Sequence, residues 1–161
     1  MDVELDDTDK GILYLLQKDA RRITTQEMGE QVGVSASTVR NRIERLENEG
    51  IIRGYYPDVD YDKAGLQLYV EIICSAPNPE REQLATDARG VSGVIAIREV
   101  LNGTENIQID AVGTNSDDVA RITDELSEIG LSVANTKIIK ETFTQPFNHF
   151  GQQFVEDDTF E

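Results

Sequence analysis

Residues 35–49 carry side chains that suit contact with nucleic acid, and these side chains recur with helical spacing. Val39, Ile43 and Leu46 stand at i, i+4 and i+7, which predicts an apolar stripe packed inward. The opposite side holds small hydroxyls, asparagine amides that can pair with adenine, and arginines that suit phosphates. The predicted DNA-contacting residues are Ser35, Ser37, Thr38, Arg40, Asn41, Arg42, Arg45 and Arg53. The alternative is an ordinary solvated face, held by pairs such as Arg40 with Glu44.

The residues before this segment predict the element that positions it. Thr24 and Glu27 have the spacing of a capping box, so a helix should begin at residue 25. Gly33 can adopt the positive φ that ends such a helix and turns the chain. Ser35 then caps the next helix, and Gly50 stops it. Helix, tight turn and helix form the layout of a helix-turn-helix DNA-binding domain.

The flanking segments complete this domain. Residues 8–20 predict a first helix that Thr8 could cap, and residues 51–59 predict a short strand and turn, a wing beside the third helix. Arg53 in that wing is a candidate phosphate contact. Residues 58–66 are polar with a glycine, and we assign them to a linker.

The overall charge opposes DNA binding. The 161 residues include 31 acids and 15 bases, a formal net charge of −16. A halophilic source would explain this excess, because molar salt shortens the Debye length to about 3 Å and carboxylates keep a surface hydrated. The alternative is an acidic protein from an ordinary cell.

Several classes of protein are not expected. No apolar run approaches the length of a membrane span, the acidic start is not a signal peptide, and we expect a cytoplasmic protein. The single cysteine, Cys74, and the single histidine, His149, do not make a usual zinc site. We find no nucleophile–base pair and no phosphate-cradling loop, so we expect no enzyme, no catalytic residue, no metal and no cofactor.

The second half predicts strands and helices in the order β-α-β-β-α-β, which is the ferredoxin-like plan. Strands are expected over 66–76, 94–103, 106–114 and 131–143, and helices over 79–90 and 116–130, the latter capped by Ser116. This plan leaves one face of the sheet open, where Tyr69 and Ile73, or the residues that alternate with them, would expose apolar surface. Pairing two such faces predicts a homodimer.

All five phenylalanines follow residue 142, and three of them have helical spacing: Phe147, Phe150 and Phe154. We expect this tail to dock on its own subunit or on a partner rather than to carry a ligand. The chain is therefore divided into a helix-turn-helix domain (1–57), a linker (58–66), a ferredoxin-like domain (67–142) and a tail (143–161).

Both halves together resemble the leucine-responsive/asparagine regulator (Lrp/AsnC) family of bacteria and archaea. The resemblance runs from about Leu5 to Glu141 and is most specific in LDDTDKGILYLLQKDAR and VSASTVRNRIERLENEGIIRGYYPDVDYDKAGL. It implies an α+β protein with an N-terminal winged helix-turn-helix domain and a C-terminal βαββαβ (RAM-type) domain. It also implies sequence-specific binding of double-stranded DNA, transcription control, homodimers that often assemble further, and a response to an amino acid or related small molecule.

In that family the effector site lies near the turn between the second and third strands of the sheet domain. The family's Gly-x-x-Asp pattern corresponds to Gly103–Asn106 here, with Asn106 in place of the acid. The effector-binding residues that the resemblance implies are Asn102, Gly103, Thr104, Asn106 and Thr136. The alternative for this turn is a plain hairpin loop. The alternative for the whole chain is a small-molecule sensor that acts through protein contacts without DNA binding.

Overall fold

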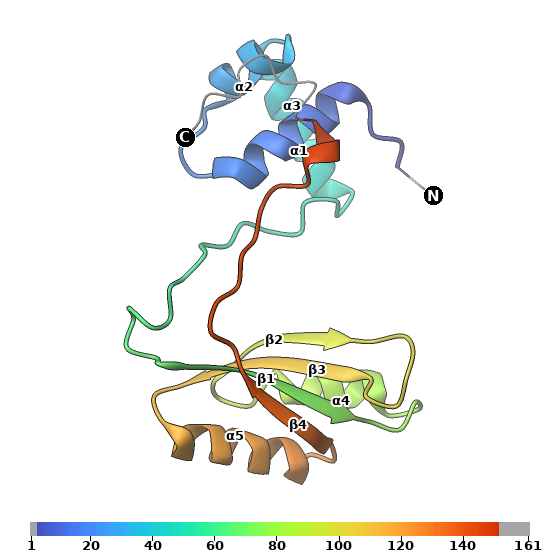
Figure 1. Ribbon diagram of the computed structural model, residues 1–161. Helices are drawn as coiled ribbons and strands as arrows, with labels where there is room; N and C mark the ends of the chain where they lie inside the picture. Colours follow the sequence, from blue (N-terminus) through green and yellow to red (C-terminus); the bar gives the residue numbers. More distant parts are fainter. Residues whose placement is uncertain (1–2, 152–161) are drawn as a thin grey trace. The chain divides into compact units, whose positions relative to one another are not determined.

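A computed structural model describes residues 3–151, and its chain forms two compact units (Figure 1). The first contains the described residues up to Pro57 together with the tail from Phe143, and the second contains residues 58–142. Within the described residues, no helix is both long enough and apolar enough to cross a membrane.

Three helices and a small core build the first unit. They are α1 (Asp7–Asp19), α2 (Thr25–Val32) and α3 (Ala36–Asn48). The core is formed by Ile12, Leu15, Met28 and Val39, so each helix contributes the apolar face that its periodicity predicts.

The helix ends of this unit follow local sequence signals, with one correction. The capping box of Thr24 and Glu27 is present, and Gly33 ends α2 with φ 76°. In α1, however, Asp6 is the N-cap instead of Thr8: its carboxylate accepts the Asp9 N–H at 2.9 Å, and the Asp9 carboxylate accepts the Asp6 N–H at 3.2 Å. A carboxylate with a second acidic residue three positions later forms a reciprocal box that a lone threonine cannot match.

Helix α3 begins and ends where the sequence predicts. The Ser35 hydroxyl accepts the Thr38 N–H at 3.1 Å, and Gly50 has φ 71° directly after the C-cap. The Gly50 N–H donates to the Glu47 carbonyl and the Ile51 N–H to the Leu46 carbonyl, which is a Schellman motif.

The strand predicted over 51–59 is wrong, because the described chain forms no ladder there. Instead, a side-chain hydrogen bond joins the segment after α3 to that helix: the Tyr55 hydroxyl donates to the Glu47 carboxylate at 2.8 Å. Partial burial, with the nearby carboxylate, raises the pKa of Tyr55 to about 12, so this hydroxyl remains a donor throughout the neutral range.

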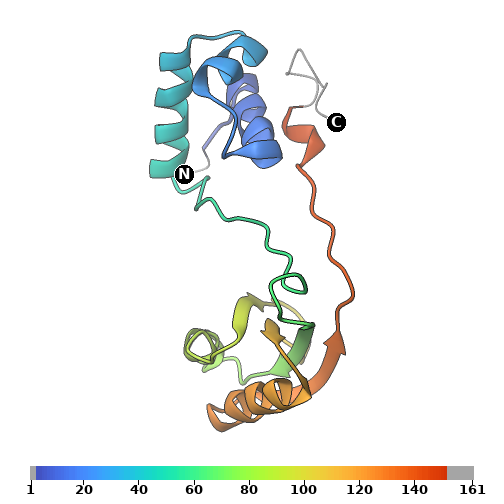
Figure 2. The ribbon, with the colours of Figure 1, turned by 90° about the vertical axis from the view of Figure 1, so that its left-hand side faces the viewer.

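The second unit has the predicted ferredoxin-like order. Its elements are β1 (Leu68–Ser75), α4 (Arg81–Ala88), β2 (Val94–Glu99), β3 (Ile107–Gly113), α5 (Ser116–Glu128) and β4 (Ser132–Ile138). The strands form one antiparallel sheet in the order β2-β3-β1-β4, and both helices cover the same face of it (Figure 2). Asn115, not Ser116, caps α5, because its side chain accepts the N–H groups of Asp117 and Asp118.

The face of the sheet away from the helices is more polar than predicted. Ile73 is only 5% exposed, and the Tyr69 hydroxyl donates to Asp110 at 3.0 Å. The Arg98 guanidinium donates two hydrogen bonds of 2.7 and 2.8 Å to the Asp110 carboxylate and one of 3.2 Å to Glu71. The expectation of an apolar open face at Tyr69 and Ile73 is therefore wrong, since strand positions of that face are joined by ionic and hydrogen bonds.

The tail docks on its own subunit in the described part, as expected. After β4 the chain crosses to the first unit, where a short 3₁₀ helix, η1 (Asn148–Phe150), contacts α1. Phe154 and Phe160 lie outside the described residues.

Replacing Gly29 by alanine should destabilise the first unit. A Cβ there would lie 2.5 Å from the Val34 carbonyl oxygen, so the turn between α2 and α3 would have to shift. We expect a loss of about 1–3 kcal/mol in the free energy of unfolding, measured by urea denaturation. Glu30→Ala, on the exposed side of the same helix, is the control and should change that free energy by less than about 0.5 kcal/mol. An equal effect of both substitutions would contradict the steric explanation.

Candidate functional site

One side of α3 is open to solvent and consists of polar side chains. Val39 and Leu46 are fully buried on the other side, which fixes the rotation of the helix about its axis. The exposed side chains are Ser37, Arg40, Asn41, Glu44, Glu47 and Asn48. The predicted surface of hydroxyl, amide and guanidinium groups is thus present, and we call residues 37, 40, 41 and 44 the reading face.

The hydroxyl groups at the start of α3 form a small network. Ser35 lies 2.8 Å from the Thr38 hydroxyl and 3.0 Å from the Ser37 hydroxyl. Ser35 and Thr38 are therefore engaged in the helix cap, while Ser37 lies at the exposed edge of the network. The N-terminal turn of α3 presents its polar groups in a fixed arrangement.

Arg42 and Arg45 do not face outward beside Asn41. Both guanidinium groups turn toward α1 and share the carboxylate of Asp9, whose side chain is 1% exposed. Arg42 Nη1 lies 3.1 Å and 3.2 Å from the two oxygens, and Arg45 Nη2 lies 2.5 Å from one of them. The expected position of Arg45 on the outward side is corrected here, because a buried carboxylate requires compensating positive charge.

Asp6 extends this ionic cluster to the surface. Arg42 Nη1 also donates to the Asp6 carboxylate at 2.6 Å. The Asp9 backbone N–H, and then Arg42, lower the pKa of Asp6, while Asp6 raises the pKa of Arg42. We call Asp6, Asp9, Arg42 and Arg45 the α1–α3 ionic cluster; it joins the first helix to the helix that carries the reading face.

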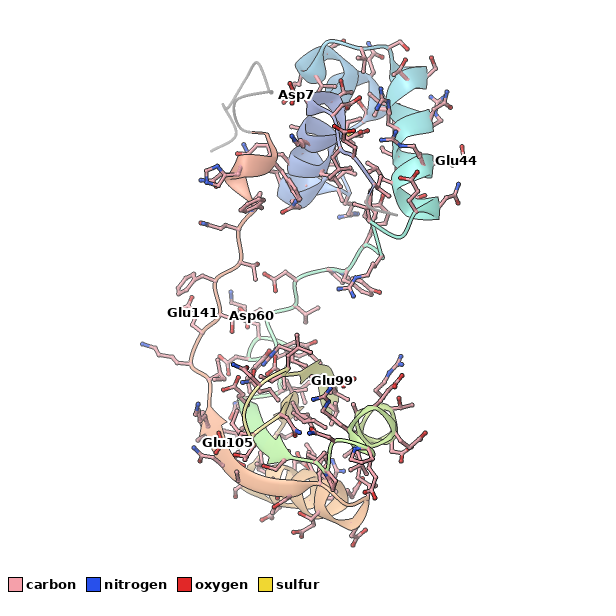
Figure 3. The ribbon with its side chains drawn as sticks, turned by 90° about the vertical axis from the view of Figure 1, so that its right-hand side faces the viewer. Asp7, Glu44, Asp60, Glu99, Glu105 and Glu141 are labelled. Atoms are coloured by element: carbon pink, nitrogen blue, oxygen red, sulfur yellow. The ribbon has the colours of Figure 1, made fainter. Side chains whose placement is uncertain are left out.

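Two arginines remain outward, and one carboxylate lies between the predicted DNA contacts. Arg40 and Arg53 are exposed and form no ion pair within residues 3–151, so the pairing of Arg40 with Glu44 is not found there. Figure 3 shows Glu44 on the side of α3 turned away from α1. Sequence reasoning treated Glu44 only as a partner of Arg40 and missed its place on the reading face, although its spacing from Ser37 and Asn41 was a sufficient signal.

A hollow of about 540 Å³ lies at the turn between β2 and β3, where the resemblance implies an effector site. Gly103, Thr104 and Asn106 line it, but Asn102 and Thr136 do not; Thr136 lies along β4 opposite Ile72. The remaining lining residues are Ser75, Ala76, Pro77, Asn78, Gly130 and Ser132. Among residues 3–151, no ionised side chain lines the hollow.

Asn106 has a structural partner that the sequence did not predict. Its amide oxygen accepts the Ala76 N–H at 2.9 Å, and its amide nitrogen donates to the Ala76 carbonyl at 2.8 Å. The residue is 3% exposed. The amide expected to hydrogen-bond an effector therefore extends the pairing between β1 and β3 instead, as a backbone peptide would.

Removing the charge of Asp9 should weaken the contact between α1 and α3. In Asp9→Asn the two arginines lose their shared carboxylate, and we expect a loss of about 2–3 kcal/mol in unfolding free energy, reduced by the partial exposure of the arginines. Asp7→Asn on the same helix is the matched control. Asp7 is 69% exposed, and its ion pair with Lys10 is long at 3.9 Å, so its loss should change stability little. Urea denaturation of both variants tests this, and equal stabilities would contradict it.

Replacing Asn106 by aspartate should weaken the second unit. Asn106→Asp keeps an acceptor for the Ala76 N–H but leaves the Ala76 carbonyl without its donor, at a cost of about 2–3 kcal/mol. Asn102→Asp, in the exposed part of the same turn, should be nearly neutral. The measurement is thermal unfolding at pH 7, and a smaller loss for Asn106→Asp than for the control would refute the role assigned to the Ala76 pair.

Comparison with known protein sequences agrees with this geometry. Residues 5–53 match the sequence model for winged helix-turn-helix DNA-binding domains. An uncharacterised HTH-type transcriptional regulator of Pyrococcus abyssi is 35% identical over 113 residues, which cover 70% of this chain and 72% of that protein. The HTH-type transcriptional regulator AldR of Mycolicibacterium smegmatis is 29% identical over 136 residues, covering 83% of this chain and 79% of AldR.

Solved structures share the fold over most of the chain. A transcriptional regulator from Neisseria meningitidis, in complex with L-Met, is 26% identical with a TM-score of 0.73, covering 89% of this chain and 95% of that one. AsnC of E. coli is 22% identical with a TM-score of 0.68, covering 87% and 95%. With the helix-turn-helix match, the sequence relatives and the βαββαβ sheet taken together, this chain belongs to the Lrp/AsnC family of DNA-binding transcriptional regulators.

Proposed function

We propose that this regulator recognises specific DNA through the reading face of α3, and that an amino acid or related small molecule bound in the hollow beside β1 alters its DNA binding. The observation that carries the first part is the exposure of Ser37, Arg40, Asn41 and Glu44 over a fully buried Val39 and Leu46. Such a helix can enter the major groove with its N-terminal turns toward base edges.

Each group on the reading face suits a different part of DNA. The Asn41 amide matches the donor and acceptor of adenine, and the Glu44 carboxylate accepts from the amino group of cytosine. Arg40 and Arg53 are the exposed cations that suit phosphates. We propose that Arg42 and Arg45 position α3 through Asp9 and lie at the margin of the contact, because their side chains are 30% and 39% exposed.

The polar side chains that line the hollow indicate which class of effector could bind there. Hydroxyl groups come from Ser75, Thr104 and Ser132, and an amide comes from Asn78. These neutral groups can hydrogen-bond the ammonium and carboxylate of an amino acid, although they offer no opposite charge. The L-Met bound to the Neisseria relative supports an amino acid as the ligand.

We further propose that the chain acts as a homodimer, or a higher oligomer of dimers, in the cytoplasm. One α3 contacts only a few base pairs, whereas two copies related by a two-fold axis read a roughly palindromic site. Half-sites are then about one helical turn, or a multiple of it, apart. The halophilic source inferred from the net charge stays a prediction.

Binding-site selection from random DNA, with and without a panel of amino acids, tests the proposed function. We expect an enriched palindrome, and a change of at least about threefold in affinity with one amino acid. Failure to enrich any site in high potassium salt would instead support the sensor without DNA binding, which the net charge of −16 favours.

Substitutions on the reading face should separate base contacts from phosphate contacts. Asn41→Ala and Glu44→Ala should each cost about 1–3 kcal/mol on the selected site and relax the preference at one base pair. Arg40→Ala should weaken binding to all sequences equally. Glu47→Gln, at the border of the exposed side, is the control: it keeps an acceptor for the Tyr55 hydroxyl and should bind normally. Gel-shift titrations on the selected site and its single-base variants measure this, and uniform losses for Asn41→Ala would exclude base reading.

A further inference from the structure

The tail is packed on α1 opposite the core of the first unit. Ile12 and Leu15 of α1 face α2 and α3, whereas Gln17 lies on the far side of the helix and Gly11 lies at the border between the two sides. The Phe147 N–H donates to the Gln17 side chain at 2.9 Å, and η1 contacts the same helix (Figure 2). Both long sides of α1 are therefore occupied, one by the core and one by the tail.

Two glycines allow this contact to be close. A Cβ added to Gly151 would lie 2.9 Å from the Gly11 Cα and 3.0 Å from its nitrogen, so the two backbones touch. Both glycines are buried. A glycine inside a helix costs about 1 kcal/mol relative to alanine, and the close backbone approach accounts for its presence at position 11.

The aromatic residues of the tail form a compact group. The Phe147 ring packs edge-on against Phe150 with centroids 5.0 Å apart, and against His149 at 5.5 Å. Edge-to-face packing of this kind fixes the relative orientation of the rings. Residues 147–151 thus form a compact segment that contacts α1, and we call them the latch.

Docking of the latch adds a second tether between the two units, formed by the chain after β4 and by the noncovalent contacts of the latch with α1. Residues 49–67 join α3 to β1 and contain no helix or strand, so this connection alone could extend to about 60 Å. Residues 139–146 join β4 to the latch and can span only about 30 Å. A docked latch therefore confines the reading face to a much smaller volume around its sheet domain.

We infer that the Gly11 side of α1 is the receptor for the latch of the same chain, and that this docking restricts the reach of the DNA-reading domain so that two half-sites are bound at a defined spacing. The partner subunit's latch is the competing occupant. Restricting the volume raises the effective concentration of the second domain at its half-site once the first has bound. The DNA effect rests on the proposed function, whereas the docking itself does not.

Thiol cross-linking of the full chain tests the docking without DNA. Lys10→Cys and Asn148→Cys place thiols on α1 and on the latch, at side chains that the latch contacts do not use. Cys74 does not compete, because it is fully buried and burial raises the pKa of its thiol to about 11. A short bifunctional reagent should yield a cross-link within one chain, seen as a monomer on a denaturing gel and located by mass spectrometry. A cross-linked dimer, or no cross-link, would overturn the inference.

A matched pair of substitutions tests the consequence for DNA. Gly151→Val should abolish the cross-link and weaken binding to paired half-sites by on the order of tenfold, with binding to a single half-site unchanged. Phe143→Ala is the control: it removes a tail phenylalanine that is 85% exposed and should change neither measurement. Loss on both kinds of DNA would mean damage to the reading face, and unchanged binding to paired sites would disprove the restriction. Failure of the unsubstituted chain to bind any DNA would instead refute the proposed function and leave the cross-linking result standing.

Discussion

The position of the reading face depends on one buried carboxylate. Asp9 lies inside α1 with its side chain 1% exposed, and it holds Arg42 and Arg45 of α3 by charge-assisted hydrogen bonds. Two guanidinium groups on one carboxylate permit few crossing geometries, because each charge-assisted hydrogen bond constrains both distance and direction. The orientation of α3 relative to α1, and hence the direction of Asn41 and Glu44, follows from that contact.

Local signals in the sequence predicted most of the fold. The Thr24–Glu27 capping box, the turn at Gly33 and the stop at Gly50 each involve residues a few positions apart, so their outcome does not depend on distant partners. The alternation of strand residues likewise predicted the βαββαβ order. The caps at Asp6 and Asn115 were missed because several neighbouring residues could serve, and only the realised geometry selects one.

The candidate sites were less predictable because they depend on long-range pairing. Helical spacing put Arg45 at the edge of the outward side, but Asp9, 36 positions away, draws it inward. The local sequence around Asn106 resembles a ligand-binding turn. The Asn106 amide nevertheless forms hydrogen bonds with both the N–H and the carbonyl of Ala76, 30 positions away. The charges of Arg98, Asp110 and Glu71 on three strands form ion pairs across a sheet face that alternation alone marked as apolar.

Because Arg42 and Arg45 pair with acidic neighbours, they also affect how the proposed DNA affinity depends on salt concentration. Each phosphate neutralised by a protein cation releases condensed counterions, so the logarithm of the binding constant falls by about 0.9 per contact for each tenfold rise in salt concentration. With Arg40 and Arg53 as the outward cations of this surface, few counterions are displaced per domain. Recognition by the proposed reading face would thus draw mainly on hydrogen bonds to base edges, with these two contacts lowering the logarithm of affinity by only about 2 per domain for each tenfold rise in salt concentration.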